Sequence, residues 1–85
     1  MKLKSSFITH SSGNEQIMVS VDGSFSGMVR SNSTAAEIIN LLATEITKES
    51  IVGAMLERYD AEREVIERDV DRVLDSLRSI GALDE

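Results

Sequence analysis

The sequence has no cysteine, no proline and no tryptophan, and it has a single histidine, His10. The absence of cysteine excludes disulfide bonds, iron–sulfur clusters and zinc sites built from thiolates. A lone imidazole without a spaced set of carboxylates predicts neither a metal site nor a catalytic base. We therefore expect no enzyme activity and no cofactor.

Long apolar runs are also missing. No segment approaches the 18 or so apolar residues that a membrane-spanning helix needs, and the first 13 residues, MKLKSSFITHSSG, lack the apolar stretch of a signal sequence. These absences predict a cytoplasmic protein with no membrane partner. A length of 85 residues predicts a single domain, residues 1–85, with a small aliphatic core.

Positive charge is scarce. Nine Lys and Arg residues stand against fifteen Asp and Glu residues, which gives a net charge of -6. A protein of this charge repels phosphate backbones unless its few basic residues gather on one face. Nucleic acid is therefore not an expected partner.

The first third of the chain has the pattern of short strands and turns. Ile17, Val19 and Val21 recur at every second position, which predicts a half-buried strand with these residues on its core face. Asp22-Gly23 offers a residue that tolerates the positive φ of a tight turn. The pattern predicts a three-stranded antiparallel meander, with strands over residues 7–10, 16–21 and 25–31.

Helical periodicity follows the strands. Thr34 and Glu37 have the spacing of a capping box, so Thr34 is the expected N-cap of a first helix that ends near residue 43 or 44. Thr47 is the expected N-cap of a second helix over residues 48–59. A third helix is expected from Glu62, with Gly81 just past its end as a left-handed cap. The apolar faces are Ala35, Ile38, Ile39 and Leu42; Ile51, Val52, Met55, Leu56 and Tyr59; and Ile66, Val70, Val73, Leu74, Leu77 and Ile80.

The spacing of these residues resembles the PqqD family, named for a protein of pyrroloquinoline-quinone biosynthesis. The resemblance covers almost the whole chain. Two positions depart from the family pattern, since Ser31 stands at a usual Leu and Ile39 at a usual aromatic residue. The residues that carry the resemblance are Gly27 to Asn32, Ser33-Thr34-Ala35-Ala36, Ile38, residues 47–52, Tyr59-Asp60, Asp69-Val70, Leu74, Leu77, Gly81 and Leu83.

The resemblance implies an α+β, winged-helix-like domain of order β-β-β-α-α-α that acts as a peptide chaperone. Such a domain binds the leader of a ribosomally made precursor peptide and presents it to a modifying enzyme, typically a radical-SAM protein. The leader would lie as an added strand beside the third strand, with the third helix as the opposite wall. The peptide-binding residues that this implies are Gly27, Met28, Val29, Arg30 and Ser31 on the strand, and Asp69, Arg72, Val73, Ser76 and Leu77 on the helix.

The residues themselves allow this mode of binding. An edge strand has unpaired N–H and C=O groups, and no proline in residues 27–31 prevents another chain from pairing there. Met28 and Arg30 are expected on one face of this strand, and Val29 and Ser31 on the other.

Simpler interpretations of the same residues remain open. Met28 and Val29 could pack in the core, and Arg30 could be a solvated edge charge that deters aggregation. The third helix could present an ordinary solvated face, in which Arg72 pairs with Asp69 or Asp75, and Glu64 pairs with Arg68.

Two alternative functions belong to other classes. The chain could be a structural subunit that forms a homodimer through the same open edge. It could also be a DNA-binding winged helix that uses the helix pair of residues 34–59. The charges of the second helix disfavour DNA binding, because Lys48 and Arg58 are balanced there by Glu49 and Glu57.

Overall fold

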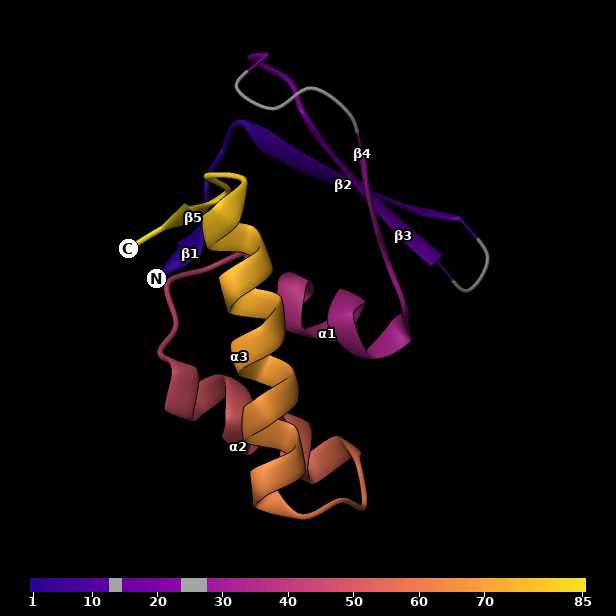
Figure 1. Ribbon diagram of the computed structural model, residues 1–85, viewed down its shortest axis with the longest axis vertical. Helices are drawn as coiled ribbons and strands as arrows, with labels where there is room; N and C mark the ends of the chain where they lie inside the picture. Colours follow the sequence, from indigo (N-terminus) through magenta and orange to yellow (C-terminus); the bar gives the residue numbers. More distant parts are fainter. Residues whose placement is uncertain (13–14, 24–27) are drawn as a thin grey trace.

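The computed structural model describes residues 1–12, 15–23 and 28–85. The predictions that fall on residues 13–14 and 24–27, including Gly27, lie outside the described residues. The protein is α+β, with three helices and short antiparallel strands (Figure 1). The elements in chain order are β1 (Lys2–Leu3), β2 (Phe7–Ser12), β3 (Glu15–Ser20), β4 (Met28–Ser31), α1 (Ser33–Leu41), α2 (Lys48–Arg58), α3 (Arg63–Ser79) and β5 (Leu83–Asp84).

The expected meander is present as an antiparallel sheet of order β2-β3-β4. In its register, Met18 of β3 lies opposite Val29 of β4, and Gln16 lies opposite Ser31. β2 continues to Ser12, two residues beyond the predicted end of the first strand. Because β4 comes last in this order, it is an edge of the sheet.

The predicted core face of the second strand is wrong. Gln16 and Met18 are buried, whereas Ile17 and Val19 are only half-buried and Val21 is 61% exposed. The reason is that α1 packs against β3 and β4 and covers the face that bears Met18 and Gln16. Apolar residues stand on both faces of this strand, so alternation alone could not identify the buried one.

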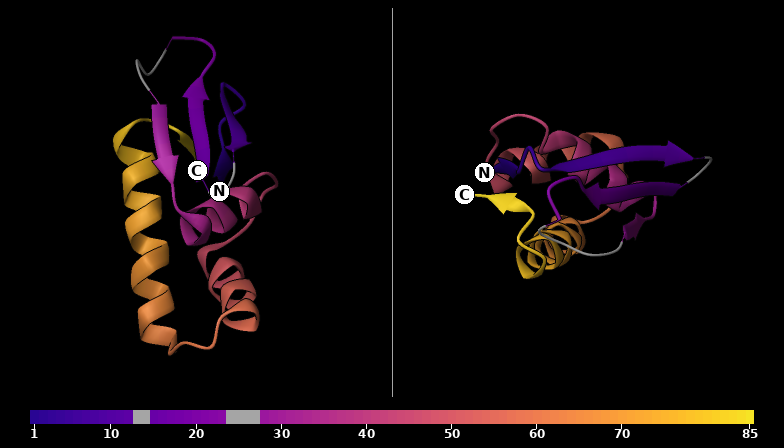
Figure 2. Two further views of the ribbon diagram at one scale, coloured as in Figure 1. Left: turned by 90° about the vertical axis from the view of Figure 1, so that its right-hand side faces the viewer. Right: turned by 90° about the horizontal axis from the view of Figure 1, so that it is seen from above.

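The helices pack against one another below this sheet. In the left view of Figure 2, the sheet lies above α1, α2 lies below it, and α3 runs along the side of all three layers. α1 is the central element, since it contacts β3, β4, α2 and α3. Leu42, the C-cap of α1, is buried together with the core residues of the helices, and all of them belong to the predicted apolar faces. The buried helix residues are Ile38, Ile39, Ile51, Val52, Met55, Ile66, Val70, Leu74 and Leu77.

The N-caps of the first two helices are provided by an amide and a hydroxyl. Thr47 caps α2 as predicted, and its side chain accepts a hydrogen bond from the Ser50 N–H at 3.2 Å. The predicted cap of the first helix is wrong, because Asn32, not Thr34, accepts from the Ala35 N–H at 2.9 Å. Asn32 keeps the extended backbone of the preceding strand, which is the conformation an N-cap requires. α1 also ends earlier than expected, at Leu41.

Asn32→Ala is expected to lower the free energy of unfolding by about 1 kcal/mol, because the Ala35 N–H loses its acceptor. Thr34→Ala, two residues further along, is expected to change it by less than about 0.5 kcal/mol. Urea unfolding followed by circular dichroism measures both. A larger loss for Thr34→Ala would show that Thr34 is the cap in solution.

The two ends of the chain pair with each other, which the sequence patterns did not indicate. β1 and β5 form an antiparallel pair in which Lys2 lies opposite Asp84 and Leu3 lies opposite Leu83. Gly81 has the predicted positive φ, 71°, and turns the chain from α3 into β5. Leu83 is buried, and Figure 1 shows both termini on the same side of the molecule.

Ion pairs join the helices at the surface. Lys48 Nζ of α2 lies 2.6 Å from Asp71 Oδ1 of α3, and Arg58 Nη1 lies 3.2 Å from Glu37 Oε2 of α1. Glu37 therefore pairs with α2 and not with the start of its own helix. At the N-terminal end of α3, the i,i+4 ion pair joins Arg63 and Glu67.

Candidate functional site

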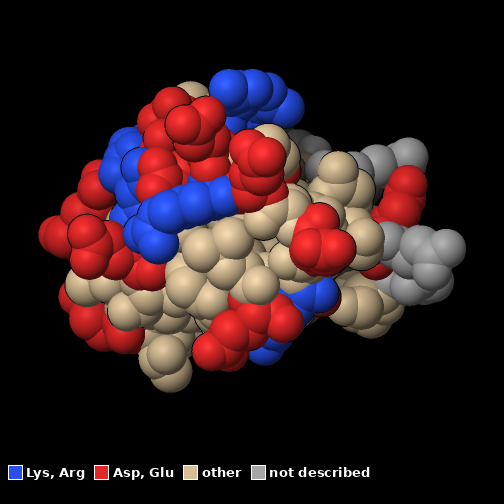
Figure 3. All heavy atoms as spheres, turned by 90° about the horizontal axis from the view of Figure 1, so that it is seen from below, with Lys and Arg blue, Asp and Glu red and all other residues tan. Residues whose placement is uncertain are grey.

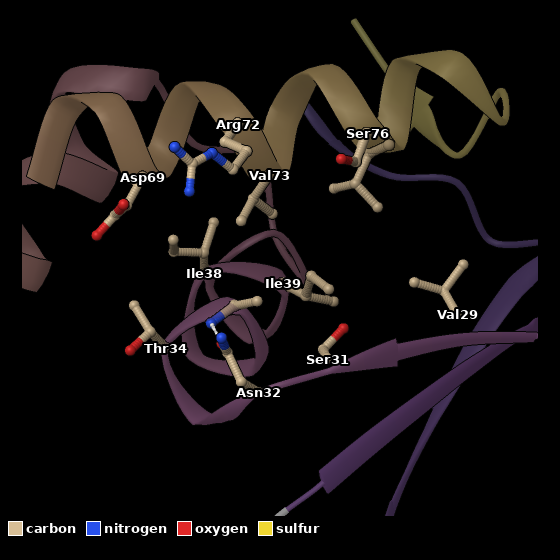
Figure 4. A pocket seen from close by; sticks show the side chains of 12 residues that line it. Val29, Ser31, Asn32, Thr34, Ile38, Ile39, Asp69, Arg72, Val73 and Ser76 are labelled. Atoms are coloured by element: carbon tan, nitrogen blue, oxygen red, sulfur yellow. Dashed lines mark hydrogen bonds between the residues drawn. The ribbon is translucent and has the colours of Figure 1, made fainter.

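A groove lies between the edge strand β4 and helix α3, with α1 as its floor. Its cavity has a volume of about 300 Å³. Figure 4 shows Val29 and Ser31 on the strand side, and Asp69, Arg72, Val73 and Ser76 on the helix side. The lining residues are Val29, Ser31, Asn32, Thr34, Ala35, Ile38, Ile39, Asp69, Arg72, Val73, Ser76 and Leu77.

Two residues of β4, Val29 and Ser31, line the strand wall of the groove. Val29 is half-buried and packs against the core, and Ser31 is 6% exposed. Both line the groove, which confirms that they share a face. Met28 and Arg30 lie in β4, but the predictions for their side chains lie outside what the structure describes.

The helix wall contains every α3 residue predicted for it. Asp69, Arg72, Val73, Ser76 and Leu77 are spaced at i, i+3, i+4, i+7 and i+8, so they form one stripe along the helix. Leu77 is buried in the core and Val73 is half-buried against it. The stripe thus has an apolar side facing the core and a polar rim of Asp69, Arg72 and Ser76.

The two charged residues of the rim are not paired with each other. Within the part of the chain that the structure describes, neither Asp69 nor Arg72 has an ion-pair partner, and Asp75 pairs with Arg78 at 3.2 Å. The alternative in which Arg72 pairs with Asp69 or Asp75 is therefore not observed. Both side chains remain able to interact with a ligand in the groove.

The floor of the groove was not part of the predicted site. It comes from the N-terminal half of α1, including Thr34, Ile38 and Ile39. Ile38 and Ile39 were expected only as core residues. The sequence does contain an indication of this floor. A single residue, Asn32, separates β4 from α1, and so short a link must bring the start of α1 to the end of the strand.

A second cavity of about 260 Å³ lies between α2 and α3. Its walls are mostly charged, and they consist of Lys48, Glu49, Val52, Arg63 and Glu67. No sheet edge lines this cavity, so it offers no strand for another chain to pair with. Among the described residues, no group of three His, Asp or Glu side chains could hold a metal ion.

The surface charges alternate in sign on the face seen from below. Figure 3 shows Lys and Arg side chains interspersed with Asp and Glu there. A nucleic-acid site needs a concentrated basic surface, and this face has none. None of the described helices is long and apolar enough to cross a membrane.

Comparison with known proteins identifies the fold and the family of the chain. No curated protein matches the chain. Among solved structures, the chain is similar to TbiB1 in complex with the TbiA(beta) leader peptide, with a TM-score of 0.84, 21% sequence identity, and coverage of 99% of this chain and 95% of that one. At this identity the similarity shows a common fold. The family model "Coenzyme PQQ synthesis protein D (PqqD)" matches residues 15–83, and the chain therefore belongs to the PqqD family.

Proposed function

We propose that residues 1–85 are one peptide-recognition domain, winged-helix-like in architecture, that binds the leader of a ribosomally made precursor peptide. The observation that carries the proposal is the open edge of β4 beside a groove whose other wall is α3. The similar structure of TbiB1 was solved with a leader peptide, which supports the same class of ligand here. The leader would add a strand to β4 and insert side chains between β4 and α3.

The energetics of such binding favour a moderate affinity. About four main-chain hydrogen bonds contribute roughly 0.5 to 1.5 kcal/mol each, and two buried apolar side chains contribute roughly 1.5 to 3 kcal/mol each. Ordering the peptide costs about 2 to 5 kcal/mol or more. The sum of these terms lies between about 0 and -10 kcal/mol. We expect a binding free energy of about -8 kcal/mol, which corresponds to a dissociation constant near micromolar and is determined mainly by the apolar side chains.

In this proposal the chain is not a catalyst. It holds the leader in the cytoplasm so that a modifying enzyme, expected from the family to be a radical-SAM protein, can act on the rest of the precursor. The mostly exposed rim of the groove supports a role in presentation, because a bound strand would keep one side accessible to the enzyme.

The proposal is tested by titrating synthetic peptides into ¹⁵N-labelled protein. The peptides tile the short open reading frames encoded beside the gene. We expect the amides of residues 28–31 and 69–77 to shift together with one peptide. Shifts confined to residues 48–58, or no shift with any peptide, would contradict the proposed groove.

The open edge also supports a second candidate, a homodimer formed by pairing of β4 with a second copy. Sedimentation velocity with and without the binding peptide separates the two. A dimer that the peptide dissociates would show that both partners compete for β4. A dimer that the peptide leaves intact would favour a purely structural subunit.

A further inference from the structure

Ser31 is a polar residue in an apolar part of the groove. It is the last residue of β4, and it is 6% exposed. Its neighbours in the cavity lining include the apolar side chains of Val29, Ile39 and Val73. In Figure 4 its hydroxyl oxygen points toward Ile39 and the space between β4 and α3.

The hydroxyl of Ser31 has no partner. Within residues 1–12, 15–23 and 28–85, the Ser31 side chain makes no hydrogen bond. Among the described residues Ser31 Oγ is not a fully buried atom without a partner, so it is accessible from the cavity. It would become buried and unpaired, which is unfavourable, if a ligand covered it without forming a hydrogen bond. This hydroxyl lines a cavity, so a ligand group that enters the cavity can supply the missing bond.

A second unsatisfied atom lies next to Ser31. Gln16 is directly opposite Ser31 across the β3–β4 pair and is 3% exposed. Its Nε2 donates to Asn40 Oδ1 at 2.8 Å, while its Oε1 is buried with no hydrogen-bond partner. Side chains directly opposite in an antiparallel pair share a face and have Cβ atoms about 5 Å apart, yet the Ser31 hydroxyl does not bond to this oxygen. Two polar groups without a partner therefore lie side by side at this end of β4.

From this arrangement we propose that Ser31 is a specificity-determining residue of the groove. The peptide side chain that enters beside it has an apolar body and a hydrogen-bonding group at its tip. A wholly apolar side chain would fill the space but would seal the Ser31 hydroxyl away from water without a partner. The proposal rests on the peptide-binding function proposed above.

The test uses a probe that does not require the natural precursor. A yeast-displayed library of random twelve-residue peptides is selected on the protein, and the best binder is synthesised. Nuclear Overhauser effects from its side chains to the methyl groups of Val29 and Ile39 identify the entering position. Two peptides are then made that carry Thr or Val there, which have nearly the same shape and differ in the hydroxyl.

We expect the wild-type protein to bind the Thr peptide about 2- to 12-fold more tightly than the Val peptide, the range for one hydrogen bond. Ser31→Ala should abolish or reverse this preference. Ser33→Ala, at an exposed position outside the cavity lining, should leave it unchanged.

The possible failures are distinguishable. Equal binding of the two peptides by the wild type, or the same preference in Ser31→Ala, would overturn the role of Ser31 while peptide binding in the groove stands. The wild-type comparison decides the question even if Ser31→Ala does not fold. Selected peptides that make no contact with Val29 or Ile39 would overturn the proposed function, and this inference with it.

Discussion

Ser76→Trp is expected to weaken peptide binding by about 100-fold or more. Ser76 lines the groove from α3, and its side chain is exposed, so the helix can accommodate a large residue there without disturbing the core. The indole would occupy much of the 300 Å³ cavity and displace the apolar side chains of the peptide. Losing two such side chains removes about 3 kcal/mol or more of binding free energy.

Ser79→Trp is the matched control. Ser79 lies three residues further along the same helix, is also exposed, and is outside the cavity lining. Fluorescence polarisation of a labelled peptide selected on the wild type measures the affinity of both variants. The natural sequence has no tryptophan, so the emission of the introduced indole also reports its environment. Equal affinities for the two variants would show that the peptide binds elsewhere.

Leu74→Ala is expected to lower the free energy of unfolding by about 2 to 5 kcal/mol. Leu74 is 1% exposed on the inner face of α3, and its removal leaves a cavity in the core. An 85-residue domain has a total stability of only about 4 to 13 kcal/mol. The loss is therefore a substantial fraction of the total stability, and urea and thermal unfolding measure it.

Val65→Ala is the comparison for this prediction. Val65 lies on the same helix, but its side chain is 46% exposed. Its truncation should cost less than about 1 kcal/mol, because little apolar surface returns to water. Similar losses for Leu74→Ala and Val65→Ala would contradict the packing of α3 described here.

The second and third helices could be predicted from the sequence because their capping residues and their apolar periodicity indicated the same boundaries. The Thr47 cap, the apolar stripe of α3 and the left-handed Gly81 are all present in the structure. The start of the first helix was predicted two residues too late, since Asn32 and Thr34 are both of a type that caps helices. Asn32 is the N-cap because it directly follows β4 and keeps an extended backbone conformation.

Two features depended on long-range packing and could not be predicted. The buried face of β3 is determined by α1 and by the register with β4, and it includes the polar Gln16 in place of the more apolar Ile17. The strands β1 and β5 have two residues each, too few to show any periodicity. The resemblance to the PqqD family predicted the residues of both groove walls. The floor was not predicted, because the position of α1 under the groove depends on how β4 and α3 pack against it.

The pairing of β1 with β5 determines how the molecule would respond to tension. Both ends leave the antiparallel pair at the same side. A pulling force would first load the contacts of Met1 with Ile46 and of Glu85 with Arg78, and would then open the Lys2–Asp84 pair before the Leu3–Leu83 pair. The hydrogen bonds between β1 and β5 would break one after another, whereas in a shear geometry they would bear the force together. Mechanical opening would therefore begin where the two ends meet.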